Sequence, residues 1–168
     1  MVMRISGEIL DRQGLCDNME YMIEKRVKRE VLSQLKDFFG QNLISIVLFG
    51  SQAQGKARLN SDIDILVIVK NLSKNWREQD ELAGQLRVNL WPKDLHNIQF
   101  ILMAPEQIDL AIEWFNPLLL SLADGCYILF DSNHFFDKIV KRIKTIFKTG
   151  VVKKRGELMW EIPQWRAI

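Results

Sequence analysis

Two short apolar runs constrain the fold of this 168-residue chain more than any other feature. Leu43–Phe49 and Ile63–Val69 are rich in β-branched residues, and the first run ends directly at Gly50. Runs of this length and composition are typical of buried strands. Residues 50–61 between them are polar and contain glycine. They predict a loop that includes the first turn of a helix.

Helical and strand-like segments follow one another through the rest of the chain. This order predicts an α+β or α/β domain with a small mixed β-sheet of about four strands and helices packed on it. Ser73 is the predicted N-cap of one helix, whose apolar side carries Trp76, Leu82, Leu86 and Leu90. The predicted helices cover residues 17–40, 73–90, 105–115, 117–123 and 133–149, and two further strands cover 97–103 and 126–130.

The composition is that of a folded protein, with 48% hydrophobic and 26% charged residues. The net charge of +2 does not by itself indicate a nucleic-acid partner. Cys16 and Cys126 stand far apart and outside any CxxC pattern, so they predict buried thiols rather than a zinc site or a disulfide. No apolar stretch reaches the roughly 18 residues of a membrane span, and the first residues do not read as a signal peptide. We therefore expect a cytoplasmic protein.

Gly50 and Ser51 directly follow the first predicted strand. A glycine lets the backbone turn sharply and lets a phosphate group approach it closely. The amides that follow would form the open N-terminal end of a helix, which binds anions through its N–H groups and its dipole. The loop is therefore suited to the phosphate tail of a nucleotide.

Asp62 and Asp64 stand two residues apart at the start of the second predicted strand. Successive side chains of a strand alternate between its faces, so both carboxylates point to one side. Two neighbouring carboxylates repel each other unless a cation lies between them, and Mg²⁺ prefers such oxygen ligands. Alone, an Asp-x-Asp pair is most often a solvated strand end, and a Gly-Ser pair is most often a turn. Together, at this spacing, they predict a site for a nucleoside triphosphate and a divalent metal.

The same residues resemble the signature of the DNA polymerase beta-type nucleotidyltransferase superfamily, in particular its minimal members. The resemblance is close over residues 43–69 and looser to about residue 131. It implies a polymerase beta-like fold and a reaction that moves a nucleoside monophosphate, such as AMP from ATP, to a hydroxyl group with release of pyrophosphate. The matching residues are Gly50, Ser51, Ala53, Gly55, Arg58, Ser61, Asp62 and Asp64.

Within that resemblance, each part of the motif has an implied role. Gly50 and Ser51 would hold the β- and γ-phosphates. Asp62 and Asp64 would hold Mg²⁺ (or Mn²⁺) and carry the catalysis. The remaining nucleotide-binding candidates are Lys56, Arg58 and Ser61, although Lys56 and Arg58 are equally well explained as surface charges.

The chain departs from the family pattern at two places. Gln52 and Gln54 stand where many minimal members have arginine. The family also uses a third carboxylate on the next strand, and Gln99 occupies that position here. An amide oxygen can contact a metal but cannot act as a base. His96 and Asp94, just before that strand, are the nearest substitutes.

The segment from Lys138 to Arg155 holds eight basic residues and no acidic one. It is either the solvated face of an amphipathic helix or a patch for an anionic partner such as RNA, DNA, a nucleotide tail or an acidic protein. The large apolar residues after it would pack back on the domain or form a small docking strip. Those residues are Trp160, Ile162, Pro163 and Trp165.

These observations predict a metal-dependent nucleotidyltransferase that acts on a hydroxyl group of a partner macromolecule. The resemblance implies that it is the antitoxin of a HEPN-type toxin pair, with a tyrosine of that small helical protein as the acceptor. The first alternative is a catalytically weakened module that binds a nucleotide or a partner, and the second is an RNA-directed transferase. We divide the chain into an N-terminal extension and helix (1–40), a nucleotidyltransferase core (41–131) and a C-terminal helix with a basic tail (132–168), and expect one compact unit.

Overall fold

The computed structural model describes residues 29–57, 61–90, 98–156 and 159–162. It begins with a helix over residues 29–39, and Gly40, at a φ of +53°, follows it. The elements that follow are η1 (Gly40–Asn42), β1 (Leu43–Phe49), α2 (Gly50–Ala53), β2 (Ile63–Val69), α3 (Trp76–Leu90), β3 (Ile98–Met103), α4 (Pro105–Glu113), α5 (Pro117–Ser121), η2 (Leu122–Asp124), β4 (Tyr127–Asp131), η3 (Ser132–His134), α6 (Phe135–Lys148), β5 (Lys153–Lys154) and β6 (Trp160–Glu161).

The centre of the fold is a four-stranded sheet with the strand order β3-β2-β1-β4. β1 is antiparallel to both of its neighbours, β2 and β4. β2 and β3 are parallel, so the chain crosses over between them through α3. The sheet is therefore mixed, and the predicted α+β class with about four strands is confirmed. β5 and β6 form a separate two-stranded ribbon.

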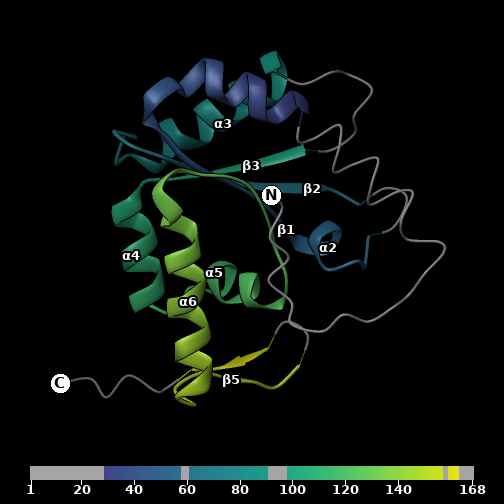
Figure 1. Ribbon diagram of the computed structural model, residues 1–168, viewed down its shortest axis with the longest axis vertical. Helices are drawn as coiled ribbons and strands as arrows, with labels where there is room; N and C mark the ends of the chain where they lie inside the picture. Colours follow the sequence, from purple (N-terminus) through teal and green to yellow (C-terminus); the bar gives the residue numbers. More distant parts are fainter. Residues whose placement is uncertain (1–28, 58–60, 91–97, 157–158, 163–168) are drawn as a thin grey trace.

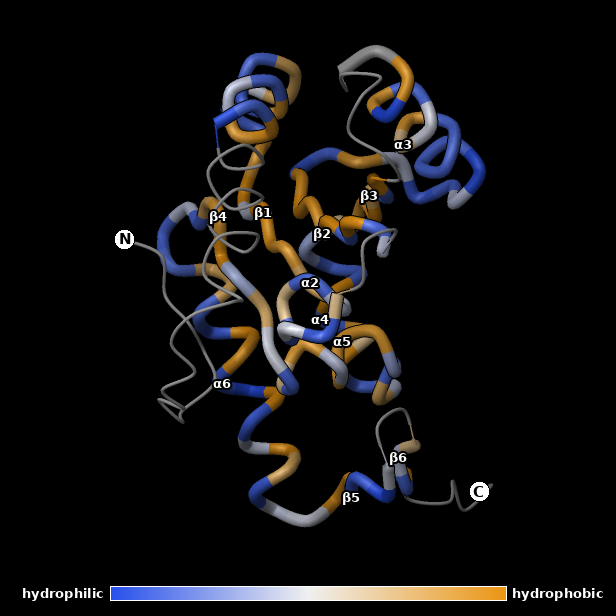
Figure 2. The backbone as a smooth tube through the Cα atoms, turned by 90° about the vertical axis from the view of Figure 1, so that its right-hand side faces the viewer, coloured by the Kyte–Doolittle hydropathy of each residue, from blue (hydrophilic) through white to orange (hydrophobic). Residues whose placement is uncertain are grey.

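Helices cover both faces of this sheet (Figure 1). The helix over residues 29–39 and α3 lie above it in that view, whereas α4, α5 and α6 lie below it. Because both faces are covered, all seven residues of β1 are buried, and the tube through the central strands is mainly hydrophobic in Figure 2. The predicted strands over 43–49 and 63–69 have the bounds of β1 and β2.

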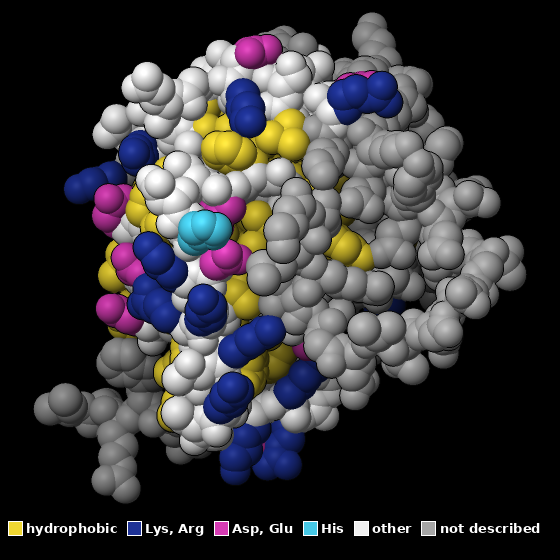
Figure 3. Space-filling model, viewed as in Figure 1, with side chains coloured by type: hydrophobic (Ala, Val, Ile, Leu, Met, Phe, Trp, Pro, Cys, Tyr) yellow, Lys and Arg dark blue, Asp and Glu magenta, His cyan; other side chains and the backbone are white. Residues whose placement is uncertain are grey.

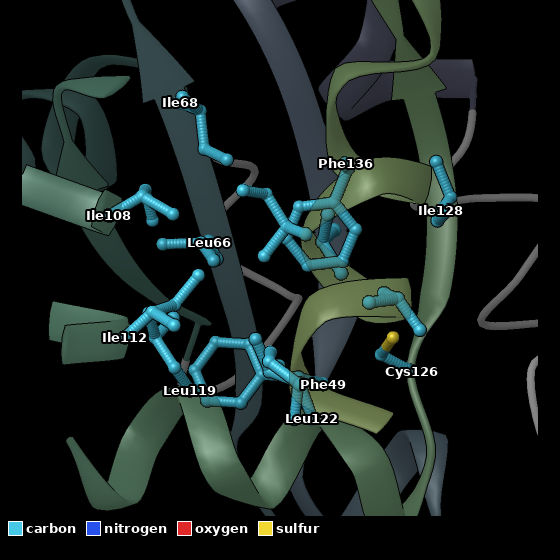
Figure 4. Close-up of a cluster of buried hydrophobic side chains, with 14 of the residues drawn as sticks. Phe49, Leu66, Ile68, Ile108, Ile112, Leu119, Leu122, Cys126, Ile128 and Phe136 are labelled. Atoms are coloured by element: carbon cyan, nitrogen blue, oxygen red, sulfur yellow. The ribbon is translucent and has the colours of Figure 1, made fainter. Parts of the chain in front are cut away.

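Alternation along the strands divides the core into two clusters. Odd-numbered residues of β2, such as Ile65 and Val67, pack with the helix over 29–39 and with α3. Leu66 and Ile68 point to the opposite face and pack with α4, α5 and α6, as Figure 4 shows. Phe136 of α6 is fully buried there. Burying a side chain of this size stabilises the fold by about 1.5–3 kcal/mol.

Two predicted details of α3 are wrong. The side chain of Asn75, not that of Ser73, accepts the N–H of Arg77 in the first turn, with an N···O distance of 3.1 Å. The hydroxyl of Ser73 instead accepts the N–H of Asn75. Trp76 was expected on the apolar side, but 68% of it is exposed, whereas Leu86 is buried as expected.

Two findings bear on what the sequence predicts about membrane spans and about the cysteines. No helix in the described part of the chain is long and apolar enough to cross a membrane. Cys126 is a free, buried thiol, and burial raises its pKa to about 12. A thiol with such a pKa is protonated at neutral pH and is a poor nucleophile. Cys16 lies outside the described residues.

Asp131 joins the end of β4 to β1 and to α6. One of its carboxylate oxygens accepts a hydrogen bond from the hydroxyl of Ser45, which is fully buried in β1, at 2.6 Å. Its two oxygens also accept the backbone N–H of Phe136 at 2.9 and 3.1 Å, and one accepts that of Asp137 at 3.3 Å. The carboxylate thereby satisfies N–H groups in the first turn of α6 that have no acceptor within the helix.

We expect Asp131→Ala to lower the free energy of unfolding by about 1–3 kcal/mol, since it removes a helix cap and leaves the Ser45 hydroxyl buried without its acceptor. Urea denaturation followed by circular dichroism measures the change. Ser45→Ala is the control, and it should cost less because the cap of α6 stays intact. A loss below about 0.5 kcal/mol for Asp131→Ala would contradict this role.

Candidate active site

The two halves of the Gly-Ser and Asp-x-Asp motif meet at one end of the sheet. β1 and β2 are antiparallel, and Phe49, the last residue of β1, pairs with Asp64 near the start of β2. Gly50 and Ser51 follow Phe49 at once and open α2, which lies at this end of the sheet in Figure 1. Strand pairing therefore places the glycine turn directly beside the carboxylate pair.

Gly50 and Asp64 are in such close contact that a larger residue at position 50 would displace the carboxylate of Asp64. The φ of Gly50 is +74°, in the left-handed region that favours glycine. A Cβ atom built on Gly50 would lie 2.2 Å from Oδ2 of Asp64. The carboxylate of Asp64 thus lies over the bare backbone of the turn, which explains why the motif needs a glycine here.

α2 is a single helical turn, and backbone hydrogen bonds close it at its far end. The N–H of Gln54 donates to the carbonyl of Gly50 at 3.1 Å, and the N–H of Lys56 donates to that of Ser51 at 3.0 Å. The first N–H groups of such a turn have no acceptor within the helix, so they are available to an anion. Ser51 is half-buried and Lys56 is exposed.

A side-chain contact links this turn to the start of β2. Nε2 of Gln52 donates to the carbonyl oxygen of Ser61 at 3.3 Å. Ser61 is half-buried and immediately precedes the exposed Asp62. Gln52, which stands where many minimal members have arginine, therefore connects the two halves of the motif here. Arg58, another predicted nucleotide contact, lies outside the described residues.

Asp62 lies close enough to Asp64 to affect the pKa of the Asp64 carboxyl. Burial raises the pKa of Asp64, and the neighbouring negative charge of Asp62 raises it further. Both effects disfavour the ionised carboxyl. A cation between the two groups would relieve this cost, because it would offset both the lost hydration and the repulsion.

These residues fit a divalent metal such as Mg²⁺ by their chemistry. Hard carboxylate oxygens suit Mg²⁺, which binds proteins through one or two carboxylates and takes its other ligands from phosphate and water. Within the described ranges, no group of three or more His, Cys, Asp or Glu side chains forms a metal site. The described chain thus offers two carboxylates, and a bound triphosphate could supply further oxygens.

Gln99 lies beside Asp64 on the neighbouring strand. The two residues are register partners in the parallel β2–β3 pair, and Gln99 is exposed. Its strand neighbours Ile101 and Met103 pack against the same core cluster as Leu66, as the alternation of β3 predicts. An amide therefore stands next to Asp64, at the position where the sequence resemblance leads us to expect a carboxylate. Asp94, His96 and Asn97 lie outside the described residues.

A cleft of about 510 Å³ opens beside Asp62 and Gln99, between α3 and the edge strand β3. The α3 residues on its wall are not among the site residues predicted from the sequence. Asp80 and Arg87 stand seven residues apart on α3 and so share one helix face, but their spacing does not show which strand they oppose. The described residues that line it are Asp62, Asp80, Ala83, Gly84, Arg87, Ile98, Gln99 and Phe100.

The family can be decided by comparison with known proteins. The model of the family described as "Nucleotidyltransferase domain" matches residues 28–114, which include β1, α2, β2, α3 and β3. The chain belongs to this nucleotidyltransferase family. The resemblance predicted from the Gly50-Ser51 and Asp62/Asp64 motif is thereby confirmed.

Curated relatives agree with this assignment. The chain is 35% identical to the "Putative protein adenylyltransferase MJ1305" of Methanocaldococcus jannaschii over 130 residues, which are 77% of this chain and 87% of the relative. It is 36% identical to spectinomycin 9-adenylyltransferase of Staphylococcus aureus over only 56 residues, 32% of this chain and 22% of that enzyme.

Among solved structures, a complex of a tri-AMPylated Shewanella oneidensis HEPN toxin with an MNT antitoxin includes a similar chain. The TM-score is 0.47 and the identity 18%, and the match covers 75% of this chain and 87% of that one. Spectinomycin adenyltransferase AAD(9) from Enterococcus faecialis, solved with ATP and spectinomycin, matches with a TM-score of 0.49 and 14% identity, over 76% of this chain and 66% of that one.

The raised pKa of Asp64 leads to a prediction for stability against pH. Between the ordinary pKa of 3.8 and the raised value, the folded chain keeps a proton on Asp64 that the unfolded chain has lost. Stability from this group therefore falls as the pH rises through that window. In the presence of a chelator at pH 7, the Asp64→Asn variant should have a melting temperature equal to or higher than that of the native protein. This difference in melting temperature should disappear below about pH 4.

Thermal melts of both proteins between pH 4 and pH 8 measure this difference. Glu81→Gln, which removes an exposed carboxylate from α3, is the matched control and should show no such pH dependence. If Asp64→Asn melted far below the native protein at pH 7, the carboxylate would be a structural group rather than a site held at a cost in stability.

Proposed function

We propose that this chain transfers a nucleoside monophosphate, AMP when ATP is the donor, from a triphosphate to a hydroxyl group on a partner macromolecule. The observation that carries the proposal is the contact of Asp64 with the Gly50 turn, which holds the Asp62/Asp64 pair beside the first amides of α2. A polyphosphate and a divalent cation need these two kinds of group side by side.

In this proposal the triphosphate lies on α2. The N–H groups of its first turn and the hydroxyl of Ser51 donate hydrogen bonds to the β- and γ-phosphates. Lys56, which is exposed on the loop after the turn, adds positive charge, and Ser61, whose carbonyl oxygen accepts a hydrogen bond from Gln52, is a further proposed contact. Arg58, two positions after Lys56 in the sequence, is the remaining proposed nucleotide contact.

Asp62 and Asp64 would hold Mg²⁺, or Mn²⁺ in its place. When bound, the ion would neutralise charge on the phosphate oxygens and so favour attack at the α-phosphorus. The repulsion between the two carboxylates, together with the burial of Asp64, favours binding of a cation at this site.

The cleft between α3 and β3 is the proposed entry for the acceptor, because it opens directly beside Asp62 and Gln99. The acceptor oxygen forms a bond to the α-phosphorus while the bond to pyrophosphate breaks, and pyrophosphate leaves with the electron pair. The hydroxyl proton must leave as well. Gln99 can orient the hydroxyl but cannot accept its proton, so solvent or a carboxylate of the cleft such as Asp80 receives it.

Two lines of support favour a protein acceptor over a small molecule. The relative from Methanocaldococcus jannaschii, which matches most of this chain, is named for the transfer of adenylate to protein. The match to the spectinomycin enzyme covers only 22% of that enzyme, so most of that enzyme has no counterpart in the alignment. From the resemblance to minimal nucleotidyltransferases, we further propose that the partner is a HEPN-type helical protein and that one of its tyrosine hydroxyls is the acceptor.

A second candidate function rests on Gln99 alone. With an amide beside Asp64 instead of a carboxylate, the site has one negative charge fewer and lacks the base expected from the family pattern. The chain would then act as a binding module that holds a nucleotide or covers a partner without rapid transfer. Nucleotide binding and group transfer must therefore be tested separately.

Nucleotide binding is tested by calorimetric titration of ATP into the full chain. We expect saturable binding with Mg²⁺ and at least about tenfold weaker binding with a chelator, since a triphosphate and two carboxylates would otherwise repel each other. Asp62→Asn should reduce the difference between the two conditions. Equal affinity with and without Mg²⁺ would rule out the proposed role of the carboxylates.

Transfer is tested through Gln99→Asp, which restores a carboxylate beside Asp64. We expect this variant to attach AMP to a co-purified protein partner at least about tenfold faster than the native chain, most clearly at low Mg²⁺, because a general base contributes about 10²–10⁴ in rate. Intact-protein mass spectrometry over time gives the rate.

Gln85→Asp makes the same chemical change at an exposed position of α3 outside the cleft, and it should leave the rate unchanged. Ile98→Asp checks the strand register, because Ile98 is only 2% exposed and a charge there should prevent folding. If the native chain transferred AMP rapidly and Gln99→Asp lowered that rate, another residue would already supply the base.

A further inference from the structure

The charge of this chain is divided unevenly along its sequence. Residues 138–155 contain eight basic side chains and no acidic one. The whole chain has 23 basic and 21 acidic residues, so the remainder has 15 basic against 21 acidic, a net charge of −6. A net charge of +2 therefore conceals one strongly positive segment on a negative protein.

The structure gathers much of this positive charge on one face of α6. The inner side of the helix, with Phe136, Ile139 and Ile143, is buried in the core. Figure 3 shows dark-blue side chains along α6 and toward the β5–β6 ribbon, with acidic side chains beside them over α4. The exposed positions of α6 after its first turn are Lys138, Lys141, Arg142, Thr145 and Lys148.

Internal ion pairs occupy only part of this basic segment. Arg142 pairs with Asp109, Lys154 pairs with Asp124, and Arg155 pairs with Glu161. Lys144 is half-buried near Cys126 and does not belong to the outer face.

The lysines on the outer face of α6 differ from these. Lys138, Lys141 and Lys148 have no ion-pair partner among the residues that the structure describes. We call these three side chains the α6 lysine row. Their charges are available to an external anion.

We propose that the α6 lysine row binds the phosphate backbone of a nucleic acid without reading its sequence. The row spans ten residues of helix, about 15 Å at a rise of 1.5 Å per residue. A nucleic acid strand presents a phosphate about every 3.4 Å along its axis, so the row faces a stretch of about four nucleotides. Cations on flexible stems, at this spacing, suit a repeating line of phosphates.

The composition of the surface favours a nucleic acid over an acidic protein. Protein interfaces depend on large apolar or aromatic side chains at a desolvated centre. The outer face of α6 presents lysine, arginine and threonine only. The large exposed apolar side chains of the described chain lie on other elements, for example Phe38, Leu110 and Trp114. Phosphate binding needs no apolar centre, because release of counterions drives it.

This site is separate from the proposed active site and does not depend on its activity. The Asp62/Asp64 pair lies at the start of β2, whereas the lysine row lies on the outer face of α6. The negative remainder of the chain would repel a polyanion and so direct it to α6. A nucleic acid could then be held on the protein while the nucleotide site remains open.

The test is fluorescence polarisation with the full chain and fluorescein-labelled 20-nucleotide strands of RNA and of DNA with the same sequence, single-stranded and as duplexes. We expect saturable binding at 50 mM salt that weakens as salt is raised. For three contacts to a single strand, the slope of log K against log salt should be about −2. The four probes show which form of nucleic acid binds best.

The test variant replaces Lys138, Lys141 and Lys148 with glutamine, and we expect it to bind at least about tenfold more weakly with a flatter salt slope. The matched control replaces Lys70, Lys74 and Arg77 with glutamine, which removes the same charge from another exposed region. Affinity of the control should fall by less than about threefold. All three substituted positions of α6 are exposed, so the melting temperature should be unchanged.

Four results would overturn the inference. They are the absence of saturable binding at 50 mM salt, equal losses in both triple variants, displacement of the probe by ATP with Mg²⁺, and displacement by polyglutamate at the same charge concentration. The third would assign the probe to the nucleotide site, and the fourth would assign the lysine row to acidic polymers in general. The inference is supported if only the α6 variant loses binding and if neither competitor displaces the probe.

Discussion

The contact between Gly50 and Asp64 is the constraint on which the rest of the site depends. β1 and β2 run antiparallel, so the turn that leaves one strand must lie against the carboxylate that begins the other. With a positive φ and no room for a Cβ atom, only glycine satisfies both the backbone and the side chain at position 50. Burial and the charge of Asp62 then raise the pKa of Asp64, so the fold maintains an electrostatic cost that a cation would remove. The two core clusters on the faces of the sheet supply the stability that holds this arrangement together.

Much of the fold could be predicted from local sequence, because β1 and β2 are short apolar runs with clear ends. The bounds of α3 were less predictable, since Ser73 and Asn75 are both good caps and only the structure shows that Asn75 is used. Periodicity predicted that Trp76 lies on the apolar side of that helix. It cannot show whether another element covers the first turn of this side, and Trp76 is exposed there. The proximity of Gly50 to Asp64 followed from the motif, whereas the cleft did not. Asp80 and Arg87 oppose β3 only through the long-range parallel pairing of β2 with β3.

Gln99 affects the expected chemistry of the site rather than its fold. Strand register fixes its position beside Asp64, where the family resemblance leads us to expect a carboxylate. The groups proposed to bind the triphosphate lie on α2 and between α2 and β2 in the sequence, whereas proton removal from the acceptor would depend on β3 and α3. In this proposal, nucleotide binding and proton removal depend on different elements, so one could weaken while the other persists. The lysine row on α6 adds a third region that is independent of both.

A crystal structure of the full chain with Mn²⁺ and a non-hydrolysable ATP analogue would test the central claim most directly, because anomalous scattering locates the metal without reference to a fitted ligand. We expect a manganese peak in contact with carboxylate oxygens of both Asp62 and Asp64, and a triphosphate on the first amides of α2. A manganese ion away from these carboxylates, or a triphosphate bound elsewhere on the chain, would contradict it.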